Sequence, residues 1–311
     1  MSESEFSAVS AAAGRLALLP AGLRDILSPN AANEARVIDL LMGHTAAHGY
    51  ERVKPPLVEF ETSLLSGPGA ATGGRIFRLM DPVSQRMMGV RADMTVQMAR
   101  IASSRLKNAP RPLRLCYVGQ VLRTTANQLN PERELVQVGA ELIGSETAEA
   151  DAEIVLVAVE ALKAAGVSEL SVDLMVPPLV PTVLATLGLS AEREAQLRAA
   201  IDRKDIAAVE TLAGDHAPVL SKLLGATGQK DEALAVLHGL DLPADAHAAL
   251  DRLTTVVELI ATAEPGLRVT LDTVENRGFE YHTGIAFSLF ARGARGEMVR
   301  GEVGRGGRYR V

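Results

Sequence analysis

Two neighbouring segments of alternating apolar and polar residues constrain the fold of this chain more than any other feature. They cover residues 113–123 and 133–143, and a polar stretch, residues 124–132, separates them. Successive side chains of a β-strand point to opposite faces, so this pattern predicts an antiparallel hairpin with a long loop. The chain is therefore expected to contain an antiparallel sheet.

The segments around this hairpin predict further helices and strands. Helices are predicted over 33–48, 93–106 and 150–165, and strands over 50–58, 76–80 and 87–91. The strand over 50–58 should lie at an edge or an interface, because Pro55 and Pro56 cannot donate hydrogen bonds to a sheet.

The second half of the chain predicts a helical insertion. Residues 183–263 are rich in Ala and Leu and are broken by Gly and Pro, which predicts four or five short helices and no sheet. Strand-like sequence resumes at Leu267. We therefore expect an α+β fold, in which an antiparallel sheet is flanked by helices and carries a helical insertion over about 183–263. This domain is expected to cover residues 19–311, after a mobile tail over residues 1–18.

Composition narrows the class of protein. The 311 residues are 47% hydrophobic, which suffices for a sizeable core. No apolar run reaches the roughly 18 residues of a membrane span, and the acidic start differs from a secretory signal, so we expect a cytoplasmic protein. The net charge of -6 disfavours a broad nucleic-acid-binding surface. The single cysteine, Cys116, lies in an apolar run and is expected to be a buried thiol.

Two groups of polar residues are candidates for a site. Gln137, Gly139 and Glu141 share one face of a predicted strand, where an amide, a gap and a carboxylate could hold a small polar ligand. An ordinary solvated face is the alternative. His44 and His48 have the spacing of a metal pair, but no His-rich or Cys-rich cluster completes a site, so surface or packing histidines are favoured. No metal or cofactor is expected.

Three segments resemble the histidine-recognition parts of histidyl-tRNA synthetases, which are class II aminoacyl-tRNA synthetases. They are residues 277–284 (Arg-Gly-Phe-Glu-Tyr-His-Thr-Gly), residues 91–95 (Arg-Ala-Asp-Met-Thr) and the strand with Gln137 and Glu141. The resemblance implies a class II synthetase-like fold. It also implies a histidine-binding site made of Asp93, Thr95, Gln137, Glu141, Arg277, Tyr281 and His282.

The resemblance also implies a role for each of these residues. Asp93, Thr95 and Gln137 would hold the ammonium group of the amino acid, and Glu141 would read its imidazole. Arg277 would contact the carboxylate, and His282 stands where the family has a tyrosine that reads the imidazole. Two local alternatives remain open: Asp93 is only a helix N-cap, and Arg277 only pairs with Asp272 or Glu275.

The resemblance extends to two further synthetase motifs. The helix over 33–48 and the strand ending in Pro56 resemble motif 1, which implies self-association through this helix and strand. Residues 122–126, Leu-Arg-Thr-Thr-Ala, resemble the start of motif 2 but lack its acid and second arginine. Arg123 and Arg133 are left as residual phosphate or anion contacts. Motif 3 and an anticodon-binding domain do not occur within the 311 residues, so no aminoacylation is expected.

This combination resembles the regulatory subunits of ATP phosphoribosyltransferase. The resemblance implies a non-catalytic partner for a short-form catalytic subunit, which activates the first step of L-histidine biosynthesis and mediates feedback inhibition by L-histidine. The alternatives are a truncated catalytic core of a histidyl-tRNA synthetase and a standalone histidine-binding sensor.

Overall fold

The structure is a computed structural model, and it describes residues 18–67, 69, 74–126, 131–275, 281–292 and 298–310. Residues 1–17 of the predicted mobile tail lie outside the described residues, and only Leu18 of it is described. Arg277 also lies outside the described residues.

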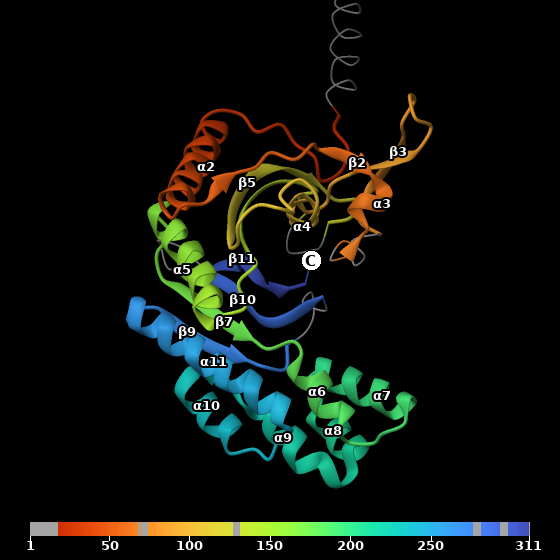
Figure 1. Cartoon of the computed structure of the whole chain (residues 1–311), viewed down its shortest axis with the longest axis vertical. Coiled ribbons are helices and arrows are strands. Elements are labelled where there is room, and N and C mark those ends of the chain that lie inside the picture. Colours follow the sequence, from red (N-terminus) through yellow and green to blue (C-terminus); the bar gives the residue numbers. More distant parts are fainter. Residues whose placement is uncertain are drawn as a thin grey trace, which may run out of the picture.

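The chain folds into helices that flank three mainly antiparallel sheets (Figure 1), which confirms the predicted fold class. The first half contains α2 (Asn30–Ala47), β1 (Glu51–Arg52), β2 (Val58–Phe60), α3 (Glu61–Leu64), β3 (Phe77–Met80), β4 (Met87–Val90), α4 (Thr95–Ser103), β5 (Leu113–Leu122), β6 (Glu134–Ile143) and α5 (Ala148–Ala164). The second half contains β7 (Leu170–Met175), α6 (Leu179–Ala185), α7 (Ala191–Asp202), α8 (Ile206–Ala213), the 3-10 helix η2 (Gly214–His216), α9 (Ala217–Gly225), β8 (Thr227–Gln229), α10 (Lys230–His238), α11 (Ala244–Ala263), β9 (Arg268–Asp272), β10 (His282–Arg292) and β11 (Met298–Tyr309).

The hairpin predicted from the alternating segments is present as β5 and β6. These strands pair antiparallel in continuous register from Leu113 opposite Ile143 to Leu122 opposite Glu134. β1 pairs parallel with β5 and forms the edge of this three-stranded sheet. Because the alternation arises within each strand, the sequence was sufficient to predict this unit.

The strand predicted over 50–58 is divided by its prolines. β1 ends at Arg52, and β2, which begins at Val58, is the edge strand of a second sheet with the order β2-β4-β3. Pro55 and Pro56 lie between them and leave two short edge strands where one was predicted.

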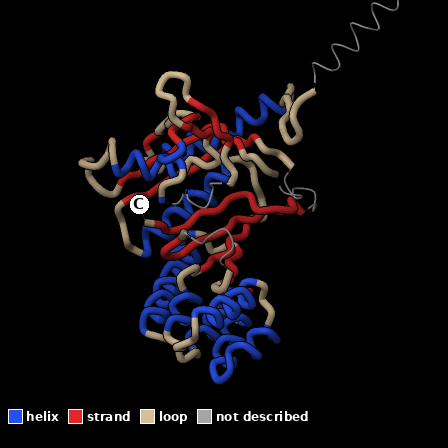
Figure 2. The backbone as a smooth tube through the Cα atoms, turned by 90° about the vertical axis from the view of Figure 1, so that its right-hand side faces the viewer, coloured by secondary structure: helices blue, strands red, loops and turns tan. Residues whose placement is uncertain are grey.

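The helices from α6 to α11 lie between β7 and β9, which pair parallel in a five-stranded sheet of order β11-β10-β7-β9-β8. In Figure 2 these helices gather at one end of the molecule and most strands at the other. The expectation of no sheet here was wrong, because β8 pairs antiparallel with β9 from Thr227 opposite Asp272. The 20-residue α11 is also longer than the short helices predicted. The boundaries of the insertion, about 183–263, stay a prediction.

A continuous apolar core joins the helices to the five-stranded sheet. It contains fully buried Val172 and Leu174 of β7 and Leu253 and Ile260 of α11. Each such side chain stabilises the fold by about 1.5 to 3 kcal/mol through burial. A smaller cluster under α2 contains Cys116, which is a buried free thiol as predicted. Among the described residues, no helix has the length and apolarity of a membrane span.

Candidate functional site

Gln137 joins β6 to the beginning of α4. Its side-chain Oε1 accepts a hydrogen bond of 2.9 Å from the backbone N–H of Met94, and its Nε2 donates to Asp93 Oδ2 at 3.2 Å. The other oxygen of Asp93 accepts the backbone N–H of Thr95 at 2.7 Å. The N-cap of α4 is Met94, so the N-cap role predicted for Asp93 was wrong. Asp93 lies one residue earlier, binds the backbone N–H of the first helical residue and contacts the polar face of β6. A carboxylate offers about four acceptor positions, so these two bonds leave it able to accept from a ligand.

Glu141 lies four residues after Gln137 on β6, on the same face of the strand, and its carboxylate lies between two phenols. Tyr309 of β11 donates a hydrogen bond of 2.8 Å to its Oε2, and the hydroxyl of Tyr117 on β5 lies 3.4 Å from its Oε1. The same hydroxyl of Tyr117 is 3.4 Å from Thr95 Oγ1. Thr95 and Glu141 are thus linked through one buried tyrosine.

Tyr117 also occupies the gap that the sequence leaves at Gly139. The two residues are direct partners in the β5–β6 register, and a Cβ at position 139 would lie 2.4 Å from Cζ of the Tyr117 ring. The alternative of an ordinary solvated face therefore does not hold at Glu141, which is covered by Tyr117 and Tyr309. Sequence reasoning did not assign either tyrosine to the site. The register of the predicted hairpin was a signal for Tyr117, since it places that ring opposite Gly139.

Tyr281 and His282 place two more aromatic rings next to Tyr309, on the same side of the Glu141 cluster. His282 begins β10 and is the register partner of Tyr309. Its ring centroid is 4.2 Å from that of Tyr281 and 6.5 Å from that of Tyr309, and Tyr281 lies edge-on to Tyr309 at 5.9 Å. His282 is buried, whereas Tyr281 is 36% exposed. Tyr117 and Tyr309 thereby connect six of the predicted site residues: Asp93, Thr95, Gln137, Glu141, Tyr281 and His282.

The environment changes the acidity of the groups in this cluster. Burial raises the pKa of Glu141 to about 7, the charge of Asp93 adds to this rise, and the hydrogen bond from Tyr309 opposes it. Burial and the neighbouring Glu141 hold the pKa of Tyr117 and of Tyr309 well above the ordinary value. At neutral pH both phenols remain donors, and Glu141 can exchange a proton with a ligand. The arrangement suits a small ligand with a cationic group and a ring nitrogen.

A cavity of about 380 Å³ adjoins this cluster at His282. Besides His282, the cavity is lined by three prolines, two arginines and a threonine: Pro177, Pro178, Pro181, Arg198, Arg310 and Thr283. The two arginines make it suited to an anionic group.

Arg133, one of the two predicted anion contacts, is used within the fold. Its Nε donates to the backbone carbonyl of Arg123 and its Nη1 to that of Ala21, each at 3.0 Å. Its guanidinium carbon lies 4.9 Å from the centre of the Phe77 ring. These contacts hold the loop end of the β5–β6 hairpin against the start of the described chain.

Arg91 is buried and supports the elements that carry the site, a role that was not identified from the sequence. It donates to the carbonyl of Gln120 at 2.7 Å and to that of Pro55 at 3.1 Å. Gln97 accepts from the same guanidinium at 3.3 Å and donates to the carbonyl of Pro56 at 2.8 Å. The motif 1-like strand is therefore tied to β5 and α4, which carry site residues.

Known proteins share this sequence and this fold. The family model described as histidyl-tRNA synthetase matches residues 22–311. The ATP phosphoribosyltransferase regulatory subunit of Rhodospirillum centenum is 55% identical over 295 residues, which are 95% of this chain and 75% of the relative. The corresponding subunit of Paramagnetospirillum magneticum is 56% identical over 293 residues, which are 94% and 76% of the two chains.

The fold comparison agrees with these relatives. A crystal structure of an ATP phosphoribosyltransferase regulatory subunit/histidyl-tRNA synthetase from Bacillus halodurans superposes with a TM-score of 0.80 at 27% identity, and the match covers 94% of this chain and 76% of the other. This chain belongs to the ATP phosphoribosyltransferase regulatory subunit family, within the histidyl-tRNA synthetase-like proteins.

Proposed function

We propose that this chain is a non-catalytic subunit that binds a short-form ATP phosphoribosyltransferase, activates it in the first step of L-histidine biosynthesis, and transmits inhibition by L-histidine. The names of its relatives support the regulatory role. The observation that carries the histidine part is the connected cluster around Glu141, where carboxylates and phenols lie together at the meeting of β6, β10 and β11.

In the proposed complex, the imidazole of L-histidine donates to Glu141, and the ammonium group lies against Asp93, Thr95 and Gln137. Tyr281 and His282 cover the ring. The ligand carboxylate is assigned to Arg277, which lies outside the described residues, so the test of the site rests on Glu141 instead.

Calorimetric titration with L-histidine tests this site. We expect Glu141→Gln to weaken binding roughly 10- to 150-fold, because it removes a charge-assisted hydrogen bond of about 1.5 to 3 kcal/mol. Glu134→Gln, at the exposed start of the same strand, is the matched control and should bind like the unmodified chain. Equal affinity in both variants would place histidine binding elsewhere.

The second part of the proposal is that the chain does not activate histidine. Thr125 and Ala126 stand where the synthetase motif has an acid and an arginine, and the loss of one donor to a charged transition state, such as this arginine, costs a factor of roughly 100 or more. Histidine-dependent exchange between pyrophosphate and ATP should therefore stay at background. Exchange on the order of 1 to 1000 turnovers per second would favour a synthetase.

Mixing the chain with a short-form ATP phosphoribosyltransferase tests the regulatory role. Activation requires tighter binding to the active state of the partner, and inhibition requires that histidine reverse this preference. We expect the two proteins to co-elute, the transferase rate to rise, and histidine to suppress the increase. Glu141→Gln should preserve activation and weaken suppression. A chain that binds histidine but neither co-elutes with nor affects the transferase is a standalone sensor.

A further inference from the structure

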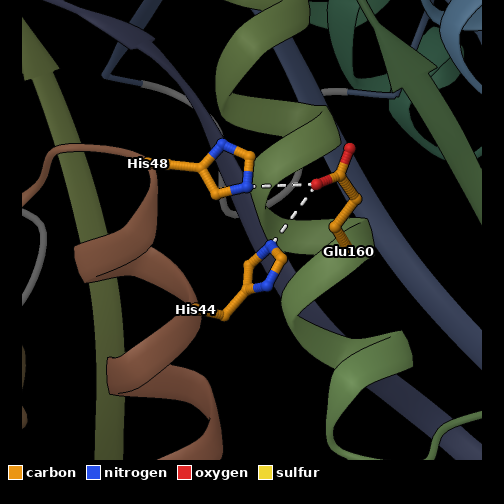
Figure 3. A group of neighbouring side chains, drawn as sticks. All are labelled: His44, His48 and Glu160. Carbon is orange, nitrogen blue, oxygen red and sulfur yellow. Dashed lines mark ion pairs between the residues drawn. The ribbon is translucent and has the colours of Figure 1, made fainter.

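Three potential metal ligands meet between α2 and α5, away from the Glu141 cluster. His44 lies in the last turn of α2 and His48 is its C-cap residue, and their ring centroids are 4.6 Å apart. Glu160 of α5 points toward both rings, as Figure 3 shows. No other group of three such ligands lies close together in the parts of the chain that the structure describes.

The distances from the Glu160 carboxylate to the two imidazoles fit a tetrahedral ion. Glu160 Oε2 lies 3.4 Å from His44 Nε2 and 3.1 Å from His48 Nε2, and all the ligand atoms are within 4.8 Å of one another. Zinc binds imidazole nitrogen and carboxylate oxygen at about 2.0 to 2.2 Å, so two ligands of a tetrahedral ion are about 3.3 Å apart. The two distances to the shared oxygen match this separation.

An ion pair alone leaves the cluster incomplete. Nε2 of His44 is buried and has no hydrogen-bond partner among the described residues, although it faces the Glu160 carboxylate. Buried polar nitrogen atoms are normally satisfied, and an unsatisfied one is costly. A metal ion bound to this lone pair would satisfy it.

The surroundings of the cluster favour a cation. His48 and Glu160 line a groove of about 640 Å³ between α5 and α11, together with Glu149, Glu153 and Glu258. Glu153 is paired with Arg114 at 2.8 Å, whereas Glu149 and Glu258 add negative charge to the groove. The groove also gives water access to an open coordination position.

We propose that His44, His48 and Glu160 bind one divalent transition-metal ion of the zinc class, which fastens α2 to α5. The ligand set of two imidazoles and one carboxylate suits zinc rather than magnesium or calcium, which prefer oxygen ligands. The site goes beyond the proposed regulation and does not depend on it. Glu160 is distant from the histidines in the sequence, which explains why the His44–His48 spacing alone indicated no site.

The test uses the untagged full chain, stripped of metal with a chelator. Calorimetry with Zn²⁺ should show one ion per chain, and Co²⁺ should give the visible absorption of a tetrahedral site. His44→Gln, His48→Gln and Glu160→Gln should each weaken Zn²⁺ binding at least tenfold and abolish the rise in melting temperature that Zn²⁺ causes. His247→Gln, which alters a histidine outside the cluster, is the matched control and should keep both effects.

Two results would overturn the proposal. One is the absence of stoichiometric Zn²⁺ binding to the unmodified chain, which would leave the cluster as an ion pair only. The other is binding that survives in the three cluster variants, which would place the ion elsewhere. Circular dichroism of the metal-free variants shows whether they fold, so that lost binding is not mistaken for unfolding.

Discussion

The carboxyl group of Glu141 is covered by the hydroxyls of Tyr117 and Tyr309, and its pKa is raised to about 7 by burial. The unfolded carboxyl titrates near 4.5. Between these values the folded chain holds a proton that the unfolded chain has released. The free energy of unfolding therefore falls as the pH rises from about 4.5 to about 7, and it stays lower above that range.

Glu141→Gln should remove this dependence, because a neutral amide needs no proton to be buried. We expect the variant to be more stable than the unmodified chain by about 1 to 3 kcal/mol at pH 8 and equally stable near pH 4. Urea unfolding at several pH values measures this. Glu134→Gln should follow the unmodified chain throughout, and a Glu141→Gln variant that does so as well would show that Glu141 is not perturbed.

Gly139 is the second residue whose size matters for the site. A Cβ there would lie 2.4 Å from the Tyr117 ring, so Gly139→Ala must displace this ring from Glu141. We expect a loss of about 1 to 3 kcal/mol in the free energy of unfolding and weaker L-histidine binding. Gly43→Ala is the control, because a Cβ at this helical position meets nothing within 4 Å and should stabilise α2 by about 0.5 to 1 kcal/mol. A Gly139→Ala variant as stable as the Gly43→Ala variant would contradict the packing argument.

At the scale of elements, Asp151 joins three of them. It lies in the first turn of α5, accepts from Arg252 of α11 at 2.7 Å, and accepts from Arg308 of β11 at 2.8 Å. Asp151 is buried, and both arginines also donate to backbone carbonyls of the turn before α5. This junction holds the last described strand against the helices, next to Tyr309.

Asp151→Asn should leave two arginines without their shared counter-charge. We expect the free energy of unfolding to fall by roughly 2 to 4 kcal/mol, somewhat less than for fully buried pairs, since both arginines keep some contact with water. Chemical denaturation measures the loss. Asp231→Asn, which removes an exposed partner of Lys230, should cost less than about 1 kcal/mol. Similar losses in both variants would mean that the Asp151 junction contributes no more than a surface pair.

The elements that could be predicted from the sequence are those whose pattern is local. The β5–β6 hairpin follows from alternation within each strand, and α2 ends two residues before Gly49, which has the left-handed conformation that favours glycine. β8 was missed because three residues carry little pattern and because its partner β9 is distant in the sequence. Tyr309 and Glu160 were missed for the same reason, since each meets its partners through tertiary contacts.

The family resemblance supplied most of the candidate site, and packing supplied the rest. Residues at matching motif positions, such as Gln137 and Glu141, were found by their flanking sequence. The covering of the Glu141 carboxylate could not be found in this way. It depends on Tyr117 and Tyr309, which come from strands on different sheets.

At the scale of the whole molecule, the candidate site bridges two sheets. Glu141 belongs to the sheet of order β1-β5-β6, whereas Tyr309 and His282 belong to the five-stranded sheet that carries the helical insertion. A ligand held by Glu141 and covered by His282 would contact both sheets at once. A shift of one sheet against the other would then alter its contacts, which is what coupling between a ligand and a partner surface requires.

Self-association, which the motif 1 resemblance implies, also belongs to the scale of the whole molecule. Apolar side chains are exposed on and beside the motif 1-like elements: Leu40 of α2 is 37% exposed, and Leu57, which follows Pro56, is 45% exposed. Complete burial of one such leucine in an interface is worth about 1.5 to 3 kcal/mol at most, which corresponds to roughly 10- to 150-fold in a dissociation constant. We propose that these residues lie in a contact between two copies of the chain.

Leu57→Asp should therefore weaken self-association at least tenfold, because it places a charge in an apolar interface. Sedimentation equilibrium over a range of concentrations measures the dissociation constant directly. Val236→Asp on α10 is the matched control, because this side chain is similarly exposed, at 42%, but lies in the helical insertion. If Val236→Asp dissociates the assembly and Leu57→Asp does not, the copies meet through the helical insertion. If the unmodified chain is a monomer at all concentrations, the motif 1-like helix and strand do not form a contact between two copies, and the proposal is wrong.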